Sequence, residues 1–114
     1  MDIQALQATL RAFAAERNWA PFHTPKNLSM ALMVEAAELI ELFQWMRPEE
    51  SCAASSDAAL HTRIGEELAD VLLYLVQLAD HTGVDLQAAV QDKLLKNAVK
   101  HPVPPAPAVT AIPG

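Results

Sequence analysis

The chain has 114 residues, 52% of them apolar and 19% charged, and its formal net charge is −6 at pH 7. This length fits one small domain, and the excess of acids argues against a general nucleic-acid-binding protein, which needs a basic face. The longest stretch without a charge outside the C-terminal tail, Val71 to Ala79, is far shorter than the roughly 20 apolar residues of a membrane-spanning helix. We therefore expect no nucleic-acid partner and no membrane span.

The N-terminus and the single cysteine predict the compartment. The first residues, MDIQ, lack the basic start and the apolar segment of a signal peptide. Cys52 is the only cysteine and has no internal disulfide partner, so its thiol suits a reducing environment. We expect a cytoplasmic protein.

Prolines and glycines are placed so that the chain is predicted to be all-α. Residues 1–20, 26–47 and 49–101 contain no proline, which leaves room for long helices. Only three glycines occur, and no segment alternates as strands do. Apolar periodicity and capping residues then predict four helices, from about Asp2 to Arg17, from about Asn27 to Met46, from about Asp57 to His81, and from Asp85 to about Lys100.

The segments between and after these helices have their own character. Residues 18–25 form an aromatic connector, 48–56 a polar link, and Gly83 is the expected C-cap of the third helix. From residue 102 the chain is rich in proline, so we predict a domain over 1–101 and an extended or disordered tail over 102–114.

The second helix and half of the third are apolar on most faces, which predicts burial on more than one side. Four helices in so short a chain cannot easily surround both. We therefore expect a four-helix bundle that is completed by homo-oligomerisation.

Four carboxylates lie inside these two apolar helices. Glu35 and Glu38 are three residues apart in the second, and Glu67 and Asp70 repeat that spacing in the third, so each pair shares a helix face. Nine acids but only two arginines lie between residues 35 and 70. Because an unpaired buried carboxylate is costly, a divalent cation is the simplest neutraliser. The alternative is that these acids make surface contacts along a helix.

The type of ligand narrows the choice of metal. All four side chains are oxygen donors, and no histidine lies three or four residues from any of them, which disfavours zinc and di-iron sites. Carboxylates favour Mg²⁺ or Mn²⁺, and Mg²⁺ is commonly held by carboxylates together with substrate phosphates. This chemistry points to a nucleotide substrate.

Aromatic and basic side chains accompany the acids. Trp45 and Tyr74 each follow an acid by seven residues, about two helical turns. With Trp19, Phe22 and His23 of the connector they would form a pocket in which a base stacks; the alternative is that they are core aromatics. The fourth helix carries a polar stripe that either holds phosphates or is a solvated face: Lys93, Lys96, Asn97 and Lys100.

The segment FAAERNWAPFHTPKNLSMALMVEAAELIELFQW, with EELADVLLYLVQLA and VDLQAAVQDKLLKNAVKHPV, resembles the MazG-like all-α nucleoside triphosphate pyrophosphatases, and is most similar to their dCTP pyrophosphatase branch. The resemblance covers residues 6–103. It implies cleavage between the α- and β-phosphates by a dimer or a dimer of dimers. The Mg²⁺ ligands it implies are Glu35, Glu38, Glu67 and Asp70. The nucleotide contacts it implies are Trp19, His23, Trp45 and Tyr74, with Lys93 and Asn97 near the phosphates.

Two residues depart from the family pattern. Val34 stands where the wider family often has a further glutamate, and Leu10 stands where the dCTP branch can carry a histidine.

The leading hypothesis is a Mg²⁺-dependent enzyme, with Mn²⁺ as a second choice of ion, that hydrolyses dCTP or modified analogues to the monophosphate and pyrophosphate and so cleans the nucleotide pool. For the proton acceptor we choose Glu38 over Glu41. The alternatives are a related enzyme acting on dUTP, other nucleoside triphosphates or phosphoribosyl-ATP, and a non-catalytic helical oligomerisation module.

Overall fold

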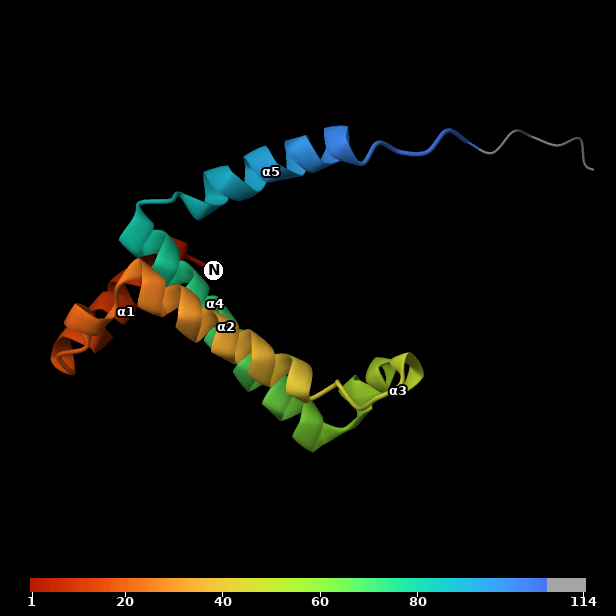
Figure 1. Ribbon diagram of the computed structural model, residues 1–114, viewed down its shortest axis with the longest axis horizontal. Coiled ribbons are helices and arrows are strands. Elements are labelled where there is room, and N and C mark those ends of the chain that lie inside the picture. Colours follow the sequence, from red (N-terminus) through yellow and green to blue (C-terminus); the bar gives the residue numbers. More distant parts are fainter. Residues whose placement is uncertain (107–114) are drawn as a thin grey trace, which may run out of the picture. The chain divides into compact units, whose positions relative to one another are not determined.

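The structure is a computed structural model that describes residues 1–106, and within them every regular element is a helix (Figure 1). In chain order the elements are α1 (Ile3–Glu16), η1 (Ala20–Phe22), α2 (Pro25–Glu41), α3 (Pro48–Cys52), η2 (Ala54–Ser56), α4 (Ala58–Thr82) and α5 (Leu86–Lys100). The predicted all-α class is confirmed. None of the described helices has the length and hydropathy to span a membrane.

Side-chain caps begin four of the helices. Asp2, Thr24, Asp57 and Asp85 each accept a hydrogen bond from the backbone N–H three residues later, which satisfies one of the free donors of a helix start. Gly83 ends α4 in the left-handed region, at φ 68°, where glycine has no steric penalty. The predicted cap residues Asp85 and Gly83 are confirmed.

The predicted end of the second helix is wrong. We expected it at Met46, but α2 ends at Glu41 and the chain turns through residues 42–46. The predicted polar link also contains a short helix, α3. Pro48 explains the second finding, because a proline keeps the preceding residue out of the helical region and favours the first position of a new helix. Arg47 is accordingly extended, with ψ 156°.

The chain forms two compact units, Met1–Val84 and a second that begins at Asp85. In the first unit α2 and α4 lie side by side and run in opposite directions, and α1 packs against α4 (Figure 1). The side chains of Leu28 and Val76 are fully buried, and Ala14 and Ala79 are nearly so. These small and branched side chains form a core that fixes the start of α2 against the end of α4.

Polar contacts also tie α1 to α4. The Gln7 Nε2 donates to the Val76 carbonyl at 2.9 Å, and the Arg11 guanidinium lies 2.7 Å from both oxygens of Asp80. The connector between α1 and α2 is therefore held over the end of α4.

Part of the apolar surface of this unit is left exposed in the single chain. The exposed members on α2 and α4 are Met30, Met33, Val34, Ile40, Leu68 and Leu75. An exposed apolar surface of this kind marks interaction sites in soluble proteins. The expected homo-oligomer stays a prediction.

The second unit consists of α5 and the start of the tail. Residues 102–106 have no regular structure, in line with the predicted tail, whose remaining residues 107–114 lie outside the described part. The boundary of a 1–101 domain stays a prediction.

Candidate metal centre and adjoining pocket

Three of the four predicted metal ligands meet between α2 and α4. Glu35 and Glu38 on α2 and Glu67 on α4 each offer a carboxylate oxygen, and these three oxygens lie within 4.8 Å of one another. The spacing of three residues puts both α2 acids on one face, and the side-by-side packing of the two helices supplies the third. We call these three residues the acid cluster.

Two oxygens of the acid cluster are buried without a partner. Among the described residues, no group hydrogen-bonds the buried Oε2 of Glu35 or the buried Oε2 of Glu67. A buried acceptor without a partner is destabilising, and more so if it is charged. The cluster is therefore incomplete as a purely protein structure. Its all-oxygen donor set fits a hard divalent cation.

The carboxyl groups of the cluster also perturb one another. Burial, and then the neighbouring Glu38 carboxyl, raises the pKa of Glu35 to about 7. Burial is likewise the main cause that raises the pKa of Glu67, and the negative charges of Glu38 and Asp70 add to it. Without a cation the cluster therefore retains a proton near neutral pH. Strongly shifted groups of this kind concentrate at functional sites.

Asp70, the fourth predicted ligand, connects the acid cluster to a pocket. It lies one helical turn beyond Glu67 on α4, and its charge contributes to the raised pKa of Glu35 and of Glu67. It also lines a cavity of about 140 Å³ formed by α1, the connector and α4. We call this cavity the aromatic pocket. Its lining residues are Leu10, Phe13, Trp19, His23, Asp70, Leu73, Tyr74 and Gln77.

A left-handed turn puts the connector aromatics in place. Asn18 has φ 56°, a conformation that asparagine tolerates better than most residues. The turn brings the Trp19 N–H back to the Ala14 carbonyl at 2.9 Å. The Trp19 ring then meets Phe13 edge-on at 5.6 Å between centroids, and His23 at 6.3 Å.

Three predicted nucleotide contacts thus line the aromatic pocket together: Trp19, His23 and Tyr74. Phe22, which we also expected there, is not among its lining residues and is 67% exposed.

The predicted position of Trp45 on the acid-bearing face of the second helix is wrong. Trp45 does not continue the acid-bearing face of α2, because that helix ends at Glu41, and it is 90% exposed. The connector lies at the start of α2, and the 17 residues of that helix span about 25 Å. Trp45 therefore lies beyond the opposite end of α2 and does not line the aromatic pocket of its own chain.

Sequence reasoning missed Gln77 as a pocket residue. It is the only polar side chain besides Tyr74 in the stretch Val71 to Ala79. It follows Asp70 by seven residues, so both share a face of α4. That spacing could have identified Gln77 from the sequence as a neighbour of the site.

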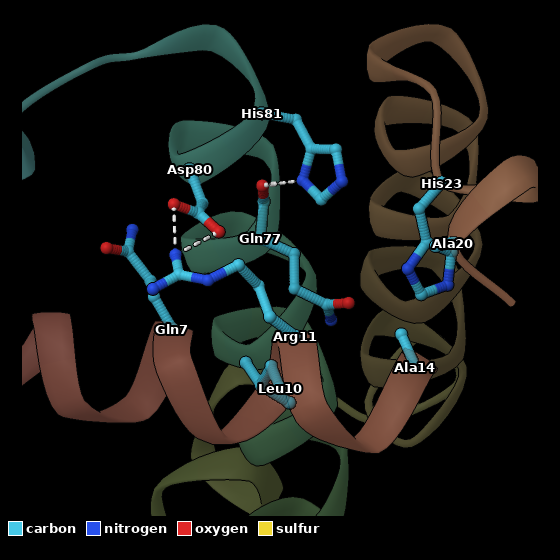
Figure 2. A pocket seen from close by; sticks show the side chains of 9 residues that line it. All are labelled: Gln7, Leu10, Arg11, Ala14, Ala20, His23, Gln77, Asp80 and His81. Atoms are coloured by element: carbon cyan, nitrogen blue, oxygen red, sulfur yellow. Dashed lines mark hydrogen bonds and ion pairs between the residues drawn. The ribbon is translucent and has the colours of Figure 1, made fainter. Parts of the chain in front are cut away.

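A second cavity of about 200 Å³ adjoins the aromatic pocket (Figure 2). The two cavities share Leu10, His23 and Gln77. The second one is also lined by the Arg11–Asp80 ion pair, and by His81, whose Nδ1 lies 2.9 Å from the backbone carbonyl oxygen of Gln77. The sequence had suggested no role for Arg11 or His81.

Lys93 and Asn97 both lie on α5, in the second unit. They are four residues apart and so share a face of that helix. Their contact with phosphates stays a prediction.

Known proteins similar to this chain have consistent descriptions. A family model described as MazG-like matches residues 30–110. The dCTP pyrophosphatase 1 of Bos taurus is 45% identical over 102 residues, which are 90% of this chain and 59% of that protein. The Homo sapiens dCTP pyrophosphatase 1 is 45% identical over 101 residues, 89% of this chain and 58% of its own.

A solved structure agrees with these sequence matches. The crystal structure of a pyrophosphatase from Archaeoglobus fulgidus superposes with a TM-score of 0.79 and 39% sequence identity, over 88% of this chain and 92% of that one. The chain spans only about 59% of the length of the curated mammalian relatives.

Proposed function

The chain belongs to the MazG-like family, and on that premise we propose that it is a nucleoside triphosphate pyrophosphohydrolase that converts dCTP to dCMP and pyrophosphate. The observation that carries the proposal is the position of Asp70, which borders both the acid cluster and the aromatic pocket. A site that joins hard carboxylates to aromatic walls suits a ligand with a phosphate end and a base end. The names of the similar proteins, dCTP pyrophosphatase 1 and a pyrophosphatase, support the same reaction.

The aromatic pocket would receive the base. Base stacking on aromatic side chains contributes about 1–3 kcal/mol per base, and Trp19 and Tyr74 offer such surfaces. The triphosphate would then extend past Asp70 toward the acid cluster. His23, which also lines this pocket, would contact the nucleotide from the connector.

The acid cluster with Asp70 fits Mg²⁺, because its donors are all oxygen and two of them are buried without a protein partner. Glu35, Glu38, Glu67 and Asp70 would hold the ion, with Mn²⁺ as a substitute. When bound, such an ion would neutralise part of the negative charge of the triphosphate and lower the pKa of the attacking water.

The attacking water would have to give up a proton to an acceptor. Water would attack the α-phosphorus, the bond to the bridging oxygen would break, and pyrophosphate would leave. We assign Glu38 as the acceptor of the water proton, since Glu35 and Glu67 each carry a buried oxygen that is suited to holding the cation.

A second copy of the chain would complete the site. Trp45 lies too far along α2 to reach the pocket of its own chain, so as a nucleotide contact it must come from another copy. The exposed apolar side chains of α2 and α4 offer a surface for such a homodimer or homotetramer. Lys93 and Asn97 on α5 would contribute to phosphate binding.

The second candidate substrate is dUTP or another nucleoside triphosphate. The choice among these substrates depends on hydrogen bonds to the edge of the base. A non-catalytic oligomerisation module is disfavoured by the unpaired buried carboxylate oxygens, which such a module has no need of. The proposed setting is the cytoplasm, with removal of unwanted nucleotides as the role.

The test is pyrophosphate release from a panel of common and modified nucleoside triphosphates in the presence of Mg²⁺ or Mn²⁺. We expect dCTP to be hydrolysed and Glu35→Gln to lose activity at least a hundredfold while the helical content is retained. Glu66→Gln is the matched control, because this exposed neighbour is not part of the acid cluster. A full panel left intact by the wild-type protein would refute the proposal.

A further inference from the structure

The side chain of Gln77 lies where the two cavities of the first unit meet. It lines both the aromatic pocket and the second cavity, together with Leu10 and His23. Most of the surrounding wall is apolar or aromatic, with Leu10, Leu73 and Tyr74 among its members. A partly buried amide in such a wall is costly unless its polar atoms are used.

The orientation of the Gln77 amide follows from its one side-chain hydrogen bond. Its Nε2 lies 2.9 Å from the Leu73 carbonyl oxygen. A carbonyl oxygen only accepts, so the NH₂ group must face Leu73. The amide oxygen Oε1 then points away from α4, and among the described residues no group donates a hydrogen bond to it. Figure 2 shows the amide reaching from α4 into the space between Leu10 and His23.

The position of Gln77 along α4 matches the layout of a nucleotide. Gln77 is the seventh residue after Asp70, which corresponds to a rise of about 10 Å along the helix. Tyr74 stands between them on the same face. The wall therefore presents a carboxylate at its phosphate end, an aromatic ring in the middle and a fixed hydrogen-bond acceptor at its far end, where the edge of a stacked base would lie.

We propose that Gln77 Oε1 accepts a hydrogen bond from the exocyclic amino group of the base and so selects cytosine-type over uracil-type nucleotides. This inference rests on the proposed function and names the residue that sets its base preference. An amino group can donate to the amide oxygen, whereas the carbonyl of uracil at the same position would place two acceptors together. Turning the amide round to serve uracil would forfeit the bond to Leu73.

Gln7 provides a matched control. It is also a glutamine, and its Nε2 also donates to a carbonyl of α4, that of Val76 at 2.9 Å. It lines the second cavity but not the aromatic pocket. Substituting it removes the same chemical group and the same type of hydrogen bond without touching the proposed contact.

The experiment compares kcat/KM for dCTP and for dUTP in the full chain with Mg²⁺, for the wild type, Gln77→Leu and Gln7→Leu. We expect the wild type to prefer dCTP. Gln77→Leu should lose about tenfold in kcat/KM for dCTP, the scale of one hydrogen bond, with dUTP unchanged or improved. Gln7→Leu should leave the ratio of the two substrates unchanged.

A substrate variant keeps the test decisive if Gln77→Leu does not fold. The triphosphate of 2-pyrimidinone deoxyriboside carries hydrogen in place of the amino group. The wild type should use it about tenfold less well than dCTP, and in a folded Gln77→Leu protein the difference should vanish, since both changes remove the same contact.

The outcomes separate this inference from the proposed function. Three results would overturn the role of Gln77 and leave the proposed pyrophosphohydrolase activity intact. The first is an equal loss of kcat/KM for dCTP and dUTP in Gln77→Leu, and the second is a wild-type preference for dUTP. The third is that the wild type uses the 2-pyrimidinone nucleotide as well as dCTP. Failure of the wild type to hydrolyse any nucleotide would overturn both.

Discussion

Glu35 on α2 and Glu67 on α4 each bury a carboxylate oxygen that no group in residues 1–106 hydrogen-bonds, and both belong to one cluster of acids within 4.8 Å. Packing two apolar helices together ordinarily excludes such groups. Without a cation, these two unpaired oxygens raise the free energy of the folded state. A cation that binds only the folded state would therefore stabilise the protein.

The first prediction concerns metal binding and stability. Mg²⁺ should raise the melting temperature of the wild type. When the free Mg²⁺ concentration is about a hundred times its Kd, the free energy of unfolding should increase by about 2.7 kcal/mol. Glu35→Gln should lose most of this gain, because it removes a negatively charged ligand. Thermal unfolding at fixed protein concentration measures the effect. Glu66→Gln should respond like the wild type, and a Mg²⁺-induced shift of equal size in Glu35→Gln would contradict the assignment.

The second prediction concerns pH in the presence of a chelator. The pKa of Glu35 is raised from 4.5 to about 7, so between these values the folded state holds a proton that the unfolded state releases. The resulting stability is fully present below pH 4.5 and is lost as the pH rises through 7. Urea unfolding should therefore show a lower free energy of unfolding at pH 8 than at pH 5.5.

The variants for this test follow from the same linkage. In Glu35→Gln the fall in stability between the two pH values should be smaller, because the amide does not titrate. Glu66→Gln should keep the full fall. A fall of the same size in Glu35→Gln and in the wild type would show that another group causes it.

The third prediction concerns the core that holds the connector. Leu28 is only 1% exposed and lies in the first turn of α2, next to the connector that carries Trp19 and His23. Leu28→Ala should cost about 2–5 kcal/mol of unfolding free energy, the range for cavities in cores. Val84→Ala, at a side chain that is 47% exposed, should change it by less than about 0.5 kcal/mol. Chemical denaturation at fixed protein concentration measures both.

The fourth prediction tests whether copies of the chain share a site. Trp45→Ala should lower pyrophosphate release although Trp45 lies outside the pocket of its own chain. Mixing Trp45→Ala with the inactive Glu35→Gln should restore part of the activity, because a chain with intact acids then receives Trp45 from the other copy. Mixtures no more active than the sum of their components would contradict a shared site. Sedimentation at equilibrium gives the oligomeric state independently.

The sequence by itself determined the parts of this protein that depend on local spacing. Proline-free apolar stretches and capping residues predicted the helices, and acids three residues apart predicted paired ligands because a helix brings such residues onto one face. The sequence also grouped the connector residues Trp19 and His23 with Tyr74, and these three side chains line one cavity; their contact with a nucleotide stays a prediction.

Only the tertiary structure decided which faces meet and where side chains point. The apolar pattern continues past Glu41, so it could not show that α2 ends there and that Trp45 turns away. Gln77 has an ordinary place in an apolar helix, and its free amide oxygen depends on the bond from Nε2 to Leu73 and on α1 packing opposite. The buried oxygens of Glu35 and Glu67 likewise exist only because α2 and α4 pack side by side. Spacing along one helix is a local property, whereas burial and unmet hydrogen bonds arise from contacts between helices.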